Sequence, residues 1–221
     1  MSWSLNEVEG LARKAARGAG YSWGLAEEAG KATRWTSAAG WPGAAALAQL
    51  LTQTDGVATS ELGPASLSKT WTAKSGALCP ITTGAVLCDL ASDWANGASL
   101  SLGPVLQPML LIPYAVWAAD RTGAALSLSW EGLTLTRADG ETYLDDPKNA
   151  RQTSRAEWVR LSPATIPEVK PTLGARLTRC YRADMSAETT ATLTAFAQRT
   201  YAPETEESRL SGAGAGLTDN D

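Results

Sequence analysis

The spacing of apolar residues changes near residue 85, and this change limits the chain to folds that join helices to a sheet. Within residues 1–52, apolar side chains recur every three to four positions, as in amphipathic helices. Within residues 85–182, apolar and polar side chains tend to alternate, as in half-buried strands. Residues 186–221 form a further helical pattern and then a glycine-rich tail. We therefore predict a single α+β domain over residues 1–221, with N-terminal helices, a central antiparallel β-meander sheet, and a C-terminal helix and tail.

Helix boundaries are marked clearly near the N-terminus. Ser4 and Glu7 have the spacing of a capping box, which predicts the start of a first helix. Ser22 is the predicted N-cap of a second helix, and Gly40 suits the left-handed position just after its end. Pro42 is predicted at the first position of a third helix, where proline is tolerated. Three alanine-rich helices in succession are expected to pack closely.

The central region is predicted to contain an antiparallel meander. Residues 126–130 and 133–137 alternate apolar and polar side chains, and the dipeptides Glu131-Gly132 and Asp139-Gly140 suit tight turns beside them. Residues 53–84 are rich in glycine and proline and are predicted to be loops with short extended pieces. Further strands are predicted at residues 85–90, 109–119, 157–161 and 175–182.

The chain contains no histidine, and this absence excludes several kinds of catalytic site. Ser-His-Asp and Cys-His activation of a nucleophile both need an imidazole, and so do most zinc and non-haem iron sites. Any chemistry must use carboxylates, tyrosine, lysine, cysteine or a metal held by oxygen ligands. We predict no cofactor and no metal site. Asp219, Asn220 and Asp221 offer carboxylate and amide oxygens, which suit a hard cation such as Mg²⁺ or Ca²⁺. The triplet lacks the other ligands of an EF-hand, and whether it binds a cation stays open.

Charge and cysteine content indicate the partners and the compartment. The net charge is −4 and the isoelectric point is about 5.0, so nothing drives the chain toward nucleic acid or an anionic membrane. No apolar run is long enough to span a bilayer, and the N-terminus does not resemble a signal peptide. Cys79, Cys88 and Cys180 are odd in number and widely spaced, which argues against a disulfide framework. We predict a cytoplasmic protein.

Residues 13–29 are the stretch most suited to binding an anion. They contain three cations and two aromatic residues at the joint between two predicted helices, where Gly18 marks a break. Tyr21 and Trp23 lie at the start of the second helix, beside backbone N–H groups that have no partner within the helix. We predict binding roles for Tyr21 and Trp23, together with Arg17. A solvated helix face is the alternative explanation for the cations.

Glu28 is the candidate catalytic residue. It follows Leu25 by three positions and precedes Ala32 by four, which places it on the predicted apolar stripe of the second helix. A carboxylate on such a stripe must be paired, hydrogen-bonded or protonated. Two explanations remain open: a buried ion pair with a cation such as Arg17, or an acid–base role in a site. Whether the protein is an enzyme is not decided by the sequence.

The C-terminal end is predicted to contain a helix capped by Ser186, followed by an acidic, glycine-rich tail from residue 204. Arg17 or Arg209 is predicted to bind a carboxylate, and Ser208 is a further predicted binding residue. The function predicted on this basis is an enzyme or binding protein for a small anionic, carboxylate-type metabolite. The alternative is a non-catalytic subunit, or a homo-oligomer, whose tail docks into a partner chain or a second copy.

Both ends of the chain resemble a known family. The segments RKAARGAGYSWGLAEEAG, residues 13–30, and SRLSGAGAGLTDND, residues 208–221, are similar to a family of bacterial proteins catalogued as a domain of unknown function. The resemblance extends over the whole chain. It implies that these segments are family traits, but it brings no activity and assigns no catalytic residues.

Overall fold

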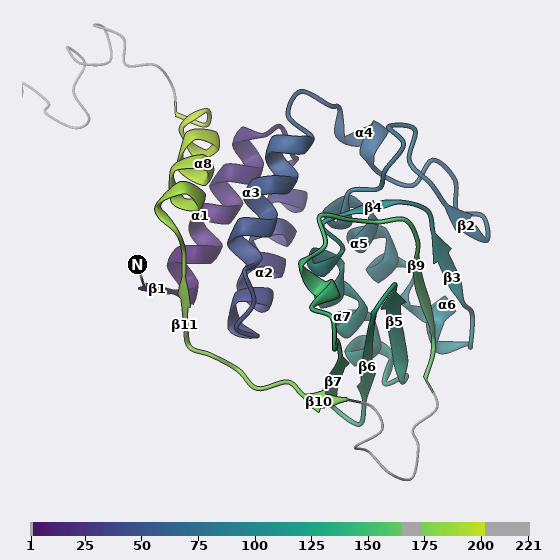
Figure 1. Cartoon of the computed structure of the whole chain (residues 1–221). Coiled ribbons are helices and arrows are strands. Elements are labelled where there is room, and N and C mark those ends of the chain that lie inside the picture. The colour runs from purple at the N-terminus through teal and green to yellow at the C-terminus, as the bar shows by residue number, and fades with distance from the viewer. Residues whose placement is uncertain (1, 165–173, 202–221) are drawn as a thin grey trace, which may run out of the picture.

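The computed structural model describes residues 2–164 and 174–201, and it shows helices packed on a mixed sheet (Figure 1). The α+β class is therefore confirmed. The predicted tail, with Ser208 and Arg209, lies outside the described residues. None of the helices in the described ranges is long and apolar enough to cross a membrane.

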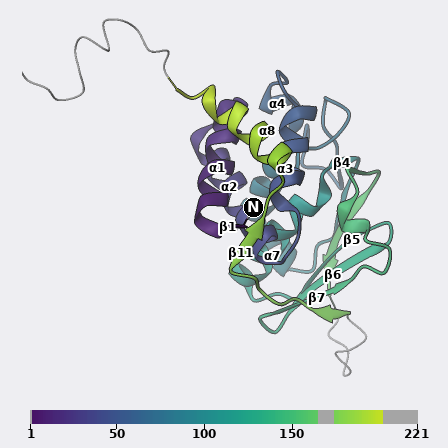
Figure 2. The ribbon, with the colours of Figure 1, turned by 60° about the vertical axis from the view of Figure 1, so that its left-hand side comes forward.

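Four helices form a layer on the side of the molecule away from the sheet (Figures 1 and 2). They are α1 (Leu5–Gly18), α2 (Trp23–Ala38), α3 (Gly43–Gln53) and α8 (Ala187–Gln198). The predicted capping box is confirmed, because the Glu7 amide donates to Ser4 Oγ at 3.2 Å and the Ser4 amide donates to Glu7 Oε2 at 2.8 Å. Ser22 and Ser186 likewise cap α2 and α8 with their side chains, as predicted.

Gly18 allows α1 and α8 to cross closely at the end of both helices. A Cβ at this position would lie 1.8 Å from the carbonyl oxygen of Phe196, which belongs to the backbone of α8 and cannot move aside alone. Gly20 follows with φ of +95°, a conformation that favours glycine. These two glycines set the angle at which the chain leaves α1 and enters α2.

The main sheet has the order β10-β7-β6-β5-β9-β3-β2. The predicted meander of β5, β6 and β7 is confirmed, with Leu128 opposite Leu135, and Asp139 and Gly140 both have positive φ in the turn. The sheet is mixed rather than purely antiparallel, because β2 pairs with β3 in parallel. Its strands are β2 (Thr70–Trp71), β3 (Leu100–Leu102), β5 (Leu126–Trp130), β6 (Leu133–Ala138), β7 (Glu141–Asp145), β9 (Val159–Pro163) and β10 (Ala175–Arg176).

The predicted strand at residues 175–182 is wrong in its middle part. The segment crosses from the sheet to the helical layer and forms two short strands, β10 and β11 (Arg182–Asp184), in different sheets. β11 pairs with β1 (Ser2–Ser4), so the N-terminal residues lie beside the entry to α8 (Figure 2). Between the two strands, the Cys180 amide donates to the Ala38 carbonyl at 2.6 Å, which attaches the crossing segment to the end of α2.

The predicted strand at residues 85–90 is wrong, because this run belongs to the helix α5 (Pro80–Asp89). Pro80 occupies the first turn, where a helix tolerates proline. The helix is buried on several sides, and an apolar run of this length cannot be assigned to a strand or a buried helix by periodicity alone. At Gly84 the ring of Tyr114 lies so close that a Cβ would come within 2.3 Å of it.

The predicted strand at residues 109–119 is also wrong. This run forms the 3-10 helix η1 (Pro108–Leu111) and the helix α7 (Ile112–Thr122), which packs between the sheet and α5. Pro113 lies in the first turn of α7, so it starts the helix instead of marking a bent strand. Gly123, with φ of +68°, ends it. Residues 85–182 therefore contain less strand than predicted.

Short elements connect these parts of the fold. They are α4 (Thr59–Leu62), α6 (Ala91–Ala95), η2 (Ala150–Gln152) and the strand pair β4 (Val105–Leu106) and β8 (Arg155–Ala156).

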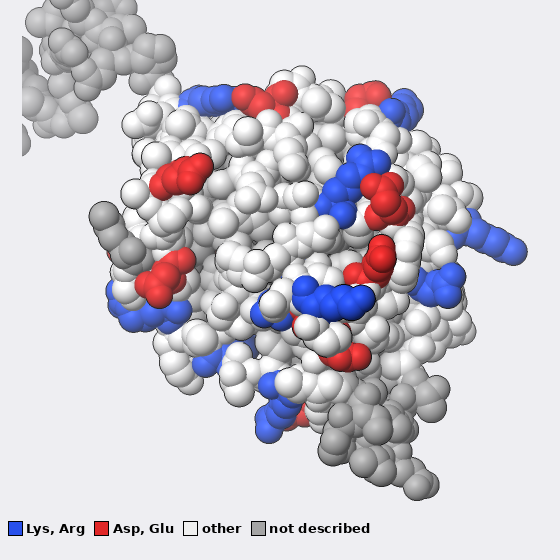
Figure 3. All heavy atoms as spheres, viewed as in Figure 1, with Lys and Arg blue, Asp and Glu red and all other residues white. Residues whose placement is uncertain are grey.

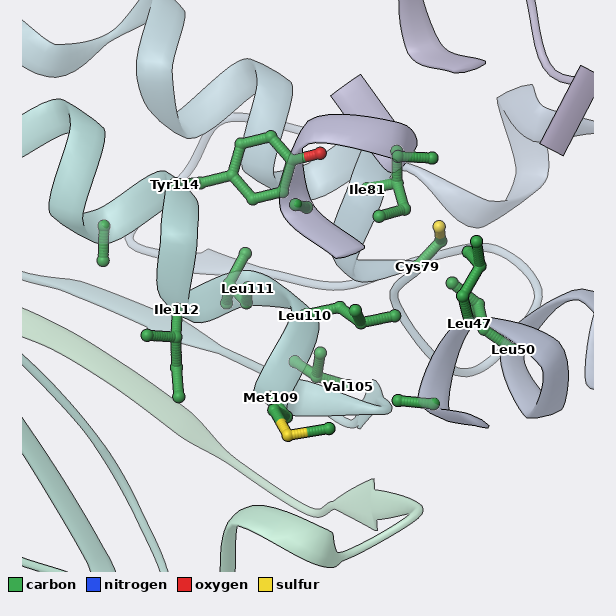
Figure 4. Packing of buried hydrophobic residues seen from close by; sticks show 14 of the residues in the cluster. Leu47, Leu50, Cys79, Ile81, Val105, Met109, Leu110, Leu111, Ile112 and Tyr114 are labelled. Atoms are coloured by element: carbon green, nitrogen blue, oxygen red, sulfur yellow. The ribbon is translucent and has the colours of Figure 1, made fainter. Parts of the chain in front are cut away.

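One hydrophobic core runs from the helical layer through α5 and α7 to the sheet. Figure 4 shows its middle, where Leu47 and Leu50 of α3 lie near Cys79 and Leu110. All four side chains are fully buried. The helical layer and the sheet thus share a core through α5 and α7, and the pockets of the molecule lie at the edges of these layers.

Candidate functional site

A pocket of about 710 Å³ opens where the end of α1, the start of α2 and the end of α8 meet. We call it the basic pocket, because four of its lining side chains are cationic and one is acidic. It is lined by Arg13, Lys14, Arg17, Gly18, Gly20, Trp23, Glu27, Arg199, Thr200 and Tyr201.

Arg17 and Trp23 are brought together in the basic pocket, as the sequence predicted for two of its binding residues. Arg17 Nη1 donates to the carbonyl oxygen of Tyr21 at 2.8 Å. The guanidinium carbon lies 4.9 Å from the centroid of the Trp23 ring, within the range of a cation–π contact. Trp23 remains 65% exposed. The guanidinium is therefore held over an indole that is still accessible to a ligand.

The other cations of the pocket differ in whether an acidic side chain pairs with them; we call a cation without such a partner uncompensated. Arg13 and Lys14 are exposed, and the described residues place no acidic group within ion-pair distance of Arg13, Lys14 or Arg17. Arg199 donates to both carboxylate oxygens of Asp55, at 2.6 and 2.9 Å, and this pairing lowers the pKa of Asp55. Three uncompensated cations and one compensated cation thus surround the pocket in a protein of net negative charge.

Charge is distributed differently on the face of the molecule seen in Figure 3. There, the charged side chains form small scattered groups, several of them mixed in sign, on a largely uncharged surface. Exposed ion pairs among the described residues include Lys31 with Glu28 and Arg176 with Glu141. Such pairs contribute little to stability and offer no uncompensated charge to a ligand.

Tyr21 lies in the core instead of the pocket. Its side chain is 1% exposed, and its hydroxyl lies 3.2 Å from Cys79 Sγ. Burial, together with the nearby Cys79 thiol, raises the pKa of Tyr21. The prediction placed Tyr21 beside Trp23 at the helix start, which is correct, but its ring turns inward. Tyr21 serves the pocket through its backbone carbonyl, which accepts the hydrogen bond from Arg17.

The prediction that Glu28 is buried is wrong. Its side chain is 32% exposed and pairs with Lys31, with Nζ and Oε1 2.8 Å apart. α2 packs on α1 through Gly30, where a Cβ would lie 3.0 Å from the Glu9 carbonyl oxygen. This close approach rotates the buried face of α2 away from the predicted stripe, and Glu28 moves to its boundary. Glu28 pairs with neither Arg17 nor any other pocket residue, and it does not line the basic pocket.

The described residues add cations and an aromatic ring that the sequence did not single out as binding residues. Arg13 and Lys14 lie one turn before Arg17 in the stretch already identified, so their position was available from the sequence. Arg199 and Tyr201 come from the end of α8, and no sequence signal connects them with α1. Within the described ranges, no three histidine, cysteine, aspartate or glutamate side chains gather as metal ligands would. The Asp219–Asn220–Asp221 triplet lies outside those ranges.

Fold and pocket together define an α+β protein with a basic, aromatic-lined cavity at one end of its helical layer. The model of a family described as "Protein of unknown function (DUF3726)" matches residues 3–79. This match confirms the resemblance to an uncharacterised family over the part that contains Arg13, Lys14, Arg17 and Trp23. It does not extend to α8 or to the C-terminal segment. No curated protein and no solved structure is significantly similar to the chain.

Proposed function

We propose that the protein binds a small carboxylate-type anion in the basic pocket. The observation that carries this proposal is the Arg17–Trp23 pair, beside the uncompensated Arg13 and Lys14. A guanidinium can donate two parallel hydrogen bonds to a carboxylate, and it does so best when its orientation is already fixed. Arg17 is fixed by the Tyr21 carbonyl and by the indole of Trp23.

The size and lining of the pocket support a small organic ligand. Its volume of about 710 Å³ lies within the range of roughly 300–1,000 Å³ that is usual for small-molecule sites. Trp23 and Tyr201 are 65% and 62% exposed, so both can cover apolar parts of a ligand while the cations bind its acidic groups.

Binding, rather than a specific reaction, is the function that this geometry supports best. Glu27 is the acidic residue among those that line the pocket, and it is exposed. No second carboxylate joins it among the described lining residues, so the lining does not provide the pair of carboxylates that acid–base catalysis by two acidic groups uses. Cys79, Cys88 and Cys180 carry free thiols, which supports a reducing compartment, and we place the binding activity in the cytoplasm.

The test is a calorimetric titration of the whole chain with a panel of small carboxylates, each beside its neutral amide. The panel contains succinate, citrate, benzoate and phthalate. We expect at least one carboxylate to bind more tightly than its amide, and Arg17→Gln to weaken that binding about tenfold, the effect of losing a charge-assisted hydrogen bond. Arg160→Gln, an exposed site on β9 away from the pocket, is the matched control and should bind like the parent.

Two results would overturn the proposal. One is a panel in which no carboxylate binds better than its amide. The other is binding of succinate, citrate or phthalate that Arg17→Gln leaves unchanged, since the anion would then lie elsewhere on the molecule.

A further inference from the structure

A second pocket, of about 540 Å³, lies between the helical layer and the edge of the sheet. We call it the interlayer pocket. Its lining comes from α2, α7, the β6–β7 hairpin and the crossing segment at residues 176–179. The residues that matter for its chemistry are Trp35, Trp117, Asp120, Arg137, Glu141 and Arg179.

Two tryptophans give the interlayer pocket apolar surface. Trp35 packs edge-to-face against Trp41, with ring centroids 5.8 Å apart, and Trp117 packs in the same way against Tyr114 at 5.0 Å. Each indole is thus in contact with another aromatic ring. Trp35 and Trp117 are each only partly buried, so part of each ring remains available to the pocket.

Arg137 places a fixed guanidinium among the lining residues. Its side chain is 18% exposed, Nε donates to Asp120 Oδ1 at 2.7 Å and Nη1 donates to Thr142 Oγ1 at 3.1 Å. No described residue accepts a hydrogen bond from Nη2. With Nε and Nη1 both donating, each donor edge of the guanidinium already has one nitrogen occupied, so Nη2 is the nitrogen left to donate to a carboxylate.

The charges of the interlayer pocket leave a single cation uncompensated. Arg137 is paired with Asp120, and Arg176 donates to both carboxylate oxygens of Glu141, at 2.6 and 2.7 Å. Arg179 is exposed, and no acidic group of the described residues lies within ion-pair distance of it. Both carboxylates are already occupied, so a ligand amine would find no free acceptor of opposite charge.

We propose that the interlayer pocket is a second binding site, which takes a flat aromatic monocarboxylate. The ring lies against Trp35 and Trp117, and the carboxylate is bound by Arg179 and by Nη2 of Arg137. The interlayer pocket shares no lining residue with the basic pocket. The proposal of this second site therefore does not depend on the function proposed for the basic pocket.

The test uses para-fluorobenzoate as the probe and follows its fluorine NMR signal as the whole chain is titrated. The titration is made in Arg17→Gln, so that binding in the basic pocket is weakened, and in the double variant Arg17→Gln/Arg179→Gln. We expect saturable binding in the single variant and about two- to fivefold weakening in the double variant, as for loss of an exposed charge contact. Arg179 is exposed, so an unchanged melting temperature will show that the substitution leaves the fold intact.

The neutral probe para-fluorobenzamide is the control for charge. Three results would overturn the proposal: no saturable binding of para-fluorobenzoate to Arg17→Gln, equal binding of the amide, or equal binding in the two variants. A second measurement locates the probe: the indole N–H signals of Trp35 and Trp117 should shift with saturation, and unshifted signals would also contradict this site.

Discussion

The two pockets use the same kinds of residue but differ in how their cations are compensated. In the basic pocket, Arg17 faces an accessible Trp23 with no acidic partner among the described residues. In the interlayer pocket, Arg137 and Arg176 are already paired with acids. Arginine beside tryptophan therefore does not define a ligand charge by itself. The charge of the expected ligand depends on whether neighbouring helices and strands place acidic side chains beside the arginine.

This difference leads to different expected ligands. Three uncompensated cations favour a ligand with more than one negative charge in the basic pocket, whereas the single uncompensated Arg179 favours a monoanion in the interlayer pocket. Phthalate and benzoate share a ring and differ by one carboxylate. We expect phthalate to bind the basic pocket more tightly than the interlayer pocket. The affinities of benzoate for the two pockets should differ less.

The largest effect is expected from Gly18→Ala. The added Cβ would lie 1.8 Å from the Phe196 carbonyl oxygen, so α1 and α8 must move apart, which should lower the free energy of unfolding by about 1–3 kcal/mol or more. The basic pocket should lose ligand affinity, because α1 and α8 both line it, and the interlayer pocket should keep its affinity. Urea melts measure the first effect and titrations the second.

Gly10→Ala is the matched control for Gly18→Ala. It lies on the same helix, and a Cβ there would meet nothing within 4 Å. Alanine is preferred over glycine inside a helix by about 1 kcal/mol, so this variant should be as stable as the parent or more stable. Equal stability of the two glycine variants would show that α1 and α8 do not pack tightly at Gly18.

Gly84→Ala should weaken binding in the interlayer pocket and spare the basic pocket, the reverse of Gly18→Ala. Its Cβ would lie 2.3 Å from the Tyr114 ring, so α5 and α7 must shift or the ring must move, with a loss of about 1–3 kcal/mol in the free energy of unfolding. Tyr114 supports Trp117, so benzoate binding in the interlayer pocket should weaken while phthalate binding in the basic pocket persists. Loss of both affinities to the same degree would mean that the pockets are not independent.

Asp55→Asn should strengthen binding in the basic pocket. Asp55 holds Arg199 with two hydrogen bonds, and its removal leaves a further uncompensated cation at the pocket. Because the pair is exposed, we expect only about a two- to threefold gain in phthalate affinity by calorimetry, and no change for benzoate in the interlayer pocket. Weaker phthalate binding would show that Asp55 positions Arg199 for the ligand.

The smallest effect concerns the thiols. Burial, with the nearby carboxylates of Glu28 and Asp89, raises the pKa of Cys88 to about 12, and burial raises that of Cys79. At mildly alkaline pH both thiols stay protonated and should alkylate slowly, whereas the exposed Cys180 should react first. Cys180 follows Arg179 in the chain, so benzoate should slow its alkylation slightly and phthalate should not. Mass spectrometry of iodoacetamide-treated protein measures this order, and early modification of Cys88 would contradict it.

The sequence predicted those parts of the fold that are set by local chemistry. Ser4, Ser22 and Ser186 cap their helices as predicted, and the turn at Asp139 and Gly140 closes its hairpin. The runs at residues 85–90 and 109–119 were assigned to strands because a buried apolar helix carries no clear period. Their helical form depends on the packing of α5 between α2 and α7, which no local pattern reveals.

The position of the candidate site was predictable to a similar extent. Arg17 and Trp23 were placed near each other because they flank a joint between two helices in one short stretch, and their binding roles remain a prediction. Glu28 was misplaced because the close approach of α1 at Gly30 rotates the buried face of α2. Arg199 and the whole interlayer pocket depend on contacts between residues far apart in the chain, so a single sequence gave no signal for either.

The most direct test of the central proposal is the indole region of a two-dimensional proton–nitrogen NMR spectrum during titration with phthalate. Nine tryptophans give nine indole signals, and Trp23 is assigned from the Trp23→Phe variant. We expect the Trp23 signal to shift with saturation, phthalamide to leave it in place, and Arg17→Gln to weaken the response. A Trp23 signal that stays fixed while phthalate binds the protein would contradict an anion site in the basic pocket.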